Sequence, residues 1–182
     1  LKQKYHPDSK YNLAALIDRA VFPGLQGGPH DHVNAAKAVC FKEALLPDFK
    51  DYASQIAKNA KALADELMDK EIKLVTNGTD NHLILADLTK QGVPGKQAET
   101  ALDEAKITVN KNTIPFEPRS PFDPSGIRMG TPALTSRGMK ESEMKTVGEL
   151  MVKVINNVEN KEILEKVKQD VIDLTSYFPL YD

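Results

Sequence analysis

The sequence has a single cysteine, Cys40, among its 182 residues, so no disulfide can form within the chain. This cysteine usage fits a reducing compartment, and we expect a cytoplasmic protein. Cys40 shares one face of an expected helix with Val33, Ala36 and Ala44. That spacing predicts that Cys40 is a small, buried, apolar residue.

Long apolar runs and a strong charge imbalance are also absent. No segment reaches the ~20 apolar residues that a membrane-spanning helix needs, and no signal peptide is recognisable. The 24 basic and 26 acidic side chains give a formal net charge of −2. This balance gives no electrostatic reason to expect nucleic acid or an anionic membrane as a partner.

Several catalytic motifs are missing as well. There is no nucleophile elbow, no Walker loop and no GxGxxG segment. His30 and His32 have neither a cysteine nor a third histidine near them in the sequence, so no metal site is predicted. The chain begins at Leu1 rather than at a methionine, and residues 1–10 are polar without periodicity. We therefore expect a portion of a longer protein.

Hydrophobic periodicity predicts helices first, then strands with one helix among them, then two closing helices. The expected helices cover residues 11–20, 32–46, 49–70, 95–106, 140–158 and 161–176, and the expected strands cover 72–75, 82–87, 107–109 and 126–130. Asp48 and Asn160 are the expected N-caps of two of these helices. The glycine- and proline-rich segment 22–32 is expected to be irregular. This order predicts an α+β domain at 47–182, with a small sheet covered by helices on one face.

Three segments carry more special residues than connectors need: 22–32, 110–119 and 125–137. Gly27 and Gly28 let backbone N–H groups approach a phosphate closely just before a helix, although the residues alone favour a tight turn between two helices. Arg128 lies between two hydrophobic residues, and its planar fork suits a carboxylate; the alternative is a structural ion pair. Asn112 has an amide that suits the edge of a heteroaromatic ring, although asparagine also favours turns.

Four segments, in order along the chain, resemble the serine hydroxymethyltransferase family. They are AVFPGLQGGPHDH at 20–32, GTDNHLILAD at 78–87, ITVNKNTIP at 107–115 and SGIRMGTPALTSRG at 125–138. The resemblance covers nearly all of residues 11–182, and residues 1–10 show no comparable match. It implies the aspartate-aminotransferase-like fold (fold type I), which has a large cofactor-binding domain and a C-terminal small α+β domain. Residues 1–46 would then end the large domain, and 47–182 would form the small one.

The resemblance implies an enzyme that uses pyridoxal 5'-phosphate to move a one-carbon unit from serine to tetrahydrofolate, which leaves glycine. It implies that Arg128 binds the substrate carboxylate, and that Gly27 and Gly28 bind the cofactor phosphate across a homodimer interface. Asn112 would contact the folate pterin, and Phe22 would lie near folate from the neighbouring subunit. No catalytic residue is expected within this chain, because the family's cofactor lysine lies in a Thr-His-Lys-Thr segment upstream of Leu1. The chain alone is therefore expected to be inactive.

Two other functions stay open. The chain could be a free-standing, non-catalytic interaction module, which a start codon directly before Leu1 would favour. An upstream reading frame that encodes Thr-His-Lys-Thr would favour the enzyme instead. The chain could also belong to another fold type I pyridoxal-phosphate enzyme, such as an aldolase or an aminotransferase. The segments NKN and SGIRMGTPA argue against this last alternative, because they match the folate-using family more closely.

Overall fold

The computed structural model describes residues 10–180, which divide into two compact units, 10–46 and 47–180. The first unit contains α2 (Leu13–Arg19), the π-helical turn η1 (Ala20–Leu25) and α3 (Asp31–Ala44). The side chain of Asn12 caps α2 by accepting a hydrogen bond from the Ala15 N–H at 2.9 Å. Within η1 the backbone leaves helical angles at Phe22 and Pro23. The expected irregular segment from 22 to 32 therefore does begin at Phe22 and Pro23, but the expectation is wrong at its other end, where α3 already begins at Asp31.

Cys40 lies on α3 as expected, but it is exposed, so the prediction that it is buried is wrong. No residue between 10 and 46 is buried. The apolar spacing around Cys40 identifies one side of the helix, but burial also requires another element to cover that side. No element of this unit, as far as the structure describes it, does so.

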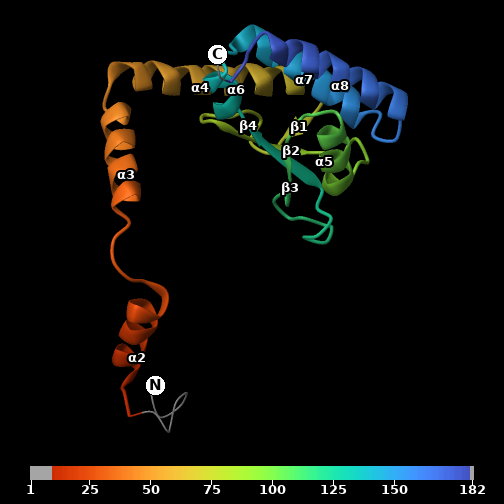
Figure 1. Ribbon diagram of the computed structural model, residues 1–182. Helices are drawn as coiled ribbons and strands as arrows, with labels where there is room; N and C mark the ends of the chain where they lie inside the picture. Colours follow the sequence, from red (N-terminus) through yellow and green to blue (C-terminus); the bar gives the residue numbers. More distant parts are fainter. Residues whose placement is uncertain (1–9, 181–182) are drawn as a thin grey trace. The chain divides into compact units, whose positions relative to one another are not determined.

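The second unit is an α+β assembly, as the sequence predicts (Figure 1). Its elements are α4 (Pro47–Asp69), β1 (Lys73–Leu74), β2 (Leu83–Asp87), α5 (Gly95–Glu104), β3 (Asn110–Asn112), β4 (Gly126–Gly130), α6 (Pro132–Ser136), α7 (Glu141–Ile155) and α8 (Lys161–Ser176). The four strands form one antiparallel sheet in the order β1-β2-β4-β3.

Most predicted boundaries agree with the structure, and β4 and α8 have the predicted limits. Asn160 caps α8 by accepting a hydrogen bond from the Ile163 N–H at 3.2 Å, which confirms that prediction. Asp48 is not an N-cap, because α4 already begins at Pro47, and proline is favourable in a first helical turn. The strand expected at 107–109 lies instead at Asn110–Asn112, where the backbone pairs with β4.

One face of the sheet is buried against the helices. Ile84, Ala86, Ile127 and Met129 join a single core with residues of α4, α5, α7 and α8, among them Leu63, Leu67, Leu102, Met144, Met151 and Val167. Figure 1 shows α4, α7 and α8 together on one side of the sheet. Side chains alternate between the two faces of a strand. Because Ile127 and Met129 are buried while Arg128 and Gly130 are exposed, the opposite face of the sheet is open.

Backbone packing at two glycines fixes the start of β4. The Gly95 N–H, at the beginning of α5, donates to the Pro124 carbonyl oxygen at 2.7 Å. A Cβ atom at Gly95 would lie 2.2 Å from the Gly126 carbonyl oxygen, and a Cβ atom at Gly126 would lie 2.7 Å from the Ala86 carbonyl oxygen. Neither position has room for a side chain, so α5, β2 and β4 meet through their backbones.

Candidate functional site

Arg128 lies at the centre of the open face of the sheet. Its neighbours in register are Leu85 on β2 and Asn110 on β3, and residues that face each other across an antiparallel pair point to the same side. The side chain is exposed, and among residues 10–180 the guanidinium has no hydrogen-bond or ion-pair partner. The structural ion pair considered as an alternative role for Arg128 is therefore not present in the described part of the chain.

Asn112 lies on the same open face, on the edge strand β3. It pairs with Gly126, two residues before Arg128 on β4, which places the two side chains on diagonal positions ~7–8 Å apart. The Asn112 Nδ2 atom donates to the Thr113 carbonyl oxygen at 2.7 Å, so the amide oxygen stays available as an acceptor. The sheet thus brings a free cation and an amide together on one surface.

Lys111, between the two asparagines of β3, points the other way. Its Nζ atom contacts the Glu99 carboxylate on α5 at 3.2 Å, and its backbone N–H donates to the same carboxylate at 3.0 Å. This pair ties β3 to α5. In the NKN segment, Asn110 and Asn112 therefore lie on the open face, whereas Lys111 has a structural role in holding β3 to α5.

Asp87 is the acid on the open face of the sheet closest in register to Arg128, but its carboxylate is already satisfied. It accepts hydrogen bonds from Lys73 Nζ at 2.8 Å and from the Thr89 N–H and hydroxyl at 3.0 and 2.5 Å. Burial opposes its ionisation, yet the bonds from Lys73 and Thr89 outweigh that effect and lower the pKa of Asp87. Arg128 is left without this counter-charge.

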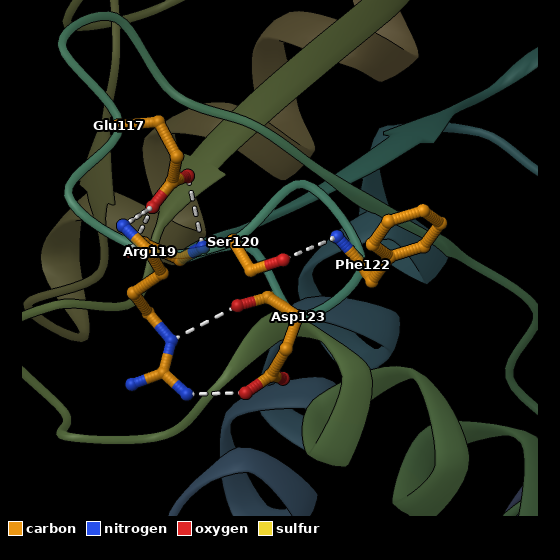
Figure 2. Close-up of polar contacts among 6 residues, drawn as sticks. Glu117, Arg119, Ser120, Phe122 and Asp123 are labelled. Atoms are coloured by element: carbon orange, nitrogen blue, oxygen red, sulfur yellow. Dashed lines mark hydrogen bonds and ion pairs between the residues drawn. The ribbon is translucent and has the colours of Figure 1, made fainter.

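A proline-rich loop, residues 113–125, joins Asn112 to the start of β4 and is organised around Glu117 (Figure 2). The Glu117 carboxylate accepts hydrogen bonds from the N–H groups of Ile114, Arg119 and Ser125 and from the Ser125 hydroxyl, at 3.1, 2.9, 3.0 and 2.6 Å. Burial raises the pKa of Glu117, but the Ser125 bonds, followed by those from Arg119 and Ile114, lower it to about 2. The carboxylate is therefore fully ionised at neutral pH.

The tip of the same loop has a second set of contacts, which Figure 2 also shows. The Arg119 guanidinium donates to the Asp123 backbone carbonyl at 3.0 Å and forms an ion pair with the Asp123 carboxylate. The Phe122 N–H donates to the Ser120 hydroxyl at 3.3 Å. The loop thus has internal structure from its base to its tip.

Gly27, Gly28 and Phe22 belong to the first unit. A Cβ atom at Gly27 or Gly28 would meet nothing within 4 Å, so the space beside both backbones is open. Their N–H groups donate to no acceptor within residues 10–180. Consecutive free N–H groups of this kind fit an anionic group such as phosphate. Phe22 is 63% exposed, in the stretch of η1 that departs from helical angles.

The rings of His30 and His32 lie edge to face, 5.8 Å apart. Between residues 10 and 180, no group of three or more His, Cys, Asp or Glu side chains is arranged to hold a metal ion. In the same part of the chain, no helix combines the length and the apolar character needed to cross a membrane.

Comparison with known proteins gives the family. A family profile described as "Serine hydroxymethyltransferase" matches residues 2–151. A curated serine hydroxymethyltransferase from Methanospirillum hungatei JF-1 is 56% identical over 169 residues, which is 93% of this chain and 41% of that relative. The chain therefore belongs to the serine hydroxymethyltransferase family and spans less than half the length of this relative. The family match includes residues 2–10, so the statement that the first ten residues show no match is wrong.

Sequence reasoning proposed Arg128 and Asn112 as site residues, and it gave no role to Glu117. A glutamate among prolines has no distinctive spacing, and its four donors are supplied by residues 114, 119 and 125, which only the folded loop brings together. The one available signal was the density of prolines at 115, 118, 121 and 124, because a loop so restricted is built to hold a single conformation.

Proposed function

We propose that the protein containing this chain catalyses the interconversion of serine and glycine, with transfer of the one-carbon unit to tetrahydrofolate. Family membership and the free guanidinium of Arg128 support this proposal. The Arg128 fork donates two parallel hydrogen bonds to the carboxylate of serine or glycine, and binding supplies the counter-charge that the described residues do not. Arg128 thereby fixes the amino acid at the open face of the sheet.

The cofactor of this reaction is pyridoxal 5'-phosphate, which when bound supplies the electron sink for bond cleavage at the amino-acid α-carbon. In the proposal, Gly27 and Gly28 donate their N–H groups to its phosphate, in the partner subunit of a homodimer. The open space and the free N–H groups at both residues fit this role. In the proposal, the residue that binds the cofactor covalently lies outside this chain, and the chain alone is inactive.

In the proposal, Asn112 holds the pterin ring of tetrahydrofolate, and Phe22 lies against folate from the neighbouring subunit. The amide of Asn112 both donates and accepts, as a pterin edge requires. Its position on the face that carries Arg128 keeps the one-carbon acceptor close to the amino acid. Residues 1–46 would then be the end of the large domain, and residues 47–182 the small domain of a fold type I enzyme.

The test uses the protein encoded by the complete open reading frame. We expect it to convert serine to glycine only when tetrahydrofolate and pyridoxal 5'-phosphate are present. Arg128→Lys keeps the charge but loses the fork, and should weaken serine binding by about 2 kcal/mol, or roughly thirtyfold, while the cofactor is retained. Arg137→Lys is the matched control, because Arg137 donates to the Thr175 carbonyl oxygen on the helical side of the domain, at 3.2 Å.

Two results would count against the proposal. Serine affinity in Arg128→Lys equal to that of the control would remove Arg128 from the substrate site. A complete protein that converts no serine would point to the non-catalytic interaction module instead.

A further inference from the structure

We infer that Glu117 is a positioning residue that holds Asn112 in place for the one-carbon acceptor, acting through the base of the loop 113–125. The inference rests on the proposed function, because it concerns the contact between Asn112 and tetrahydrofolate. The Glu117 carboxylate then affects the affinity for tetrahydrofolate and leaves the affinity for serine unchanged.

The carboxylate joins the two ends of the loop to each other. Ile114 lies two residues after Asn112, and Ser125 lies directly before β4. Oε2 of Glu117 accepts from the N–H groups of both, at 3.1 and 3.0 Å, while Oε1 accepts from the Ser125 hydroxyl and the Arg119 N–H. Four donors on one ionised group close the loop at its base.

The two ends differ in what else holds them. On the β4 side, the Ser125 carbonyl oxygen accepts from the Leu88 N–H at 3.0 Å, and the Pro124 carbonyl oxygen accepts from the Gly95 N–H at 2.7 Å. On the β3 side, the Ile114 N–H has Glu117 as its one hydrogen-bond partner among the described residues. The β4 side therefore keeps its place without Glu117. On the β3 side, Glu99 holds Lys111 and Asn112 pairs with β4, but the backbone at Ile114 is anchored by Glu117 alone among the described residues.

Ile114 connects this anchor to the site. Its Cγ2 atom lies 2.8 Å from where a Cβ atom of Gly126 would be, and Gly126 pairs directly with Asn112. The side chain of Ile114 thus covers the end of the open face beside Asn112. If the Ile114 backbone loses its anchor, the pairing at the last residue of the three-residue strand β3 loses its support.

The chain next to Glu117 also needs an external constraint. Phe116 has a φ of 58°, in the left-handed region that a bulky side chain adopts at an energetic cost. Hydrogen bonds from both sides of Phe116, at Ile114 and at Arg119, converge on Glu117 and hold this conformation. Without them the loop can relax to an ordinary backbone conformation and carry Ile114 with it.

The experiment compares Glu117→Ala and Glu117→Gln with Glu165→Gln in the protein encoded by the complete reading frame. Glu165 is a suitable control, because it is an exposed acid on α8 that pairs with Lys168 at 2.9 Å. Glutamine can keep the bonds from Ile114 and Ser125 through its oxygen, and its amide group can donate to the Ser125 hydroxyl. The same amide group faces the Arg119 N–H as a donor, so that one bond is lost. Because glutamine keeps the other bonds and alanine keeps none, Glu117→Gln should have a smaller effect than Glu117→Ala.

Three quantities are measured for each variant: KM for serine, KM and calorimetric Kd for tetrahydrofolate, and amide hydrogen exchange. In Glu117→Ala we expect KM and Kd for tetrahydrofolate to rise about tenfold, as for the loss of one hydrogen bond, with KM for serine unchanged. Exchange should accelerate in residues 110–119 and stay unchanged in β4. Glu117→Gln should show the same pattern at smaller amplitude, and Glu165→Gln should match the wild type.

The inference would be overturned if KM rose equally for serine and for tetrahydrofolate. It would also be overturned if exchange in residues 110–119 became faster while the affinity for tetrahydrofolate did not change. Unchanged exchange in residues 110–119 would overturn it as well. If Glu117→Ala does not fold, Glu117→Gln decides by the same criteria. Wild-type protein that binds tetrahydrofolate but does not turn over serine would contradict the proposed function alone, since the calorimetric comparison still tests Glu117. Wild-type protein that does not bind tetrahydrofolate would overturn both.

Discussion

Replacing Gly95 with alanine places a methyl group against the backbone at the start of β4. The new Cβ atom would lie 2.2 Å from the Gly126 carbonyl oxygen and 2.9 Å from the Pro124 carbonyl oxygen. Neither contact can be relieved by turning a side chain. The first turn of α5 must therefore move by about 1 Å, which breaks the 2.7 Å hydrogen bond from the Gly95 N–H to Pro124.

Two opposing effects decide the size of the change. Alanine is a better helix former than glycine by about 1 kcal/mol. Overpacking costs about 1–3 kcal/mol, and leaving the buried Pro124 carbonyl without its donor costs about 1–3 kcal/mol more. The destabilising effects are larger, so we expect Gly95→Ala to lower the free energy of unfolding by about 3 kcal/mol.

Urea unfolding followed by far-UV circular dichroism measures this change. Lys96→Ala is the matched control, since Lys96 is the exposed next residue of the same helix, and its replacement should change stability by less than about 0.5 kcal/mol. If Gly95→Ala is as stable as Lys96→Ala or the wild type, the backbone contact between α5 and β4 is not as close as described. The reasoning would then fail.

Two further predictions concern other anchors of the same domain. Asn59 is fully buried, and its amide donates to the Met139 carbonyl and the Thr135 hydroxyl at 2.9 Å each. Asn59→Ala should therefore lower the free energy of unfolding in urea by about 2–3 kcal/mol. A decrease no greater than that of the control Asn34→Ala, at an exposed position, would contradict this. The lowered pKa of Glu117 means that its carboxylate stabilises the fold above its ordinary pKa of 4.5 and loses this effect as the pH falls toward about 2. The difference in unfolding free energy between wild type and Glu117→Gln should therefore shrink between about pH 7 and about pH 3, and a constant difference over that range would show that ionisation of Glu117 is not involved.

The limits of β4 could be predicted from the sequence because glycines bound it and its side chains alternate in polarity. The same alternation singled out Arg128 as a charged residue between two hydrophobic ones. It could not decide whether Arg128 has a structural partner, because strand register is set by long-range pairing. Only the register shows that Asp87 lies opposite Gly126, and only the folded contacts show that Lys73 and Thr89 already satisfy it.

Errors in the prediction have physical causes of the same kind. Ile107 and Val109 have the composition of a strand, but the Ile107 N–H completes the end of α5 by donating to the Leu102 carbonyl at 2.8 Å. Pairing with β4 starts only at Asn110. At Cys40, periodicity correctly gave the helix but not the burial, because burial depends on elements that a local pattern does not contain.

Arg128 and Asn112, the two polar residues of the proposed site on the open face, are held in place by different contacts, so substitutions should affect them differently. Arg128 lies inside a strand with partners on both sides, and its strand is fixed by backbone contacts at Gly95 and Gly126. Asn112 ends a three-residue edge strand whose continuation depends on one carboxylate, that of Glu117. Because Gly95 also helps to fix the β4 side of the loop, changes there should disturb both groups. Changes at Glu117 should disturb Asn112 alone, so affinity for the acceptor can vary in this fold without loss of the amino-acid site.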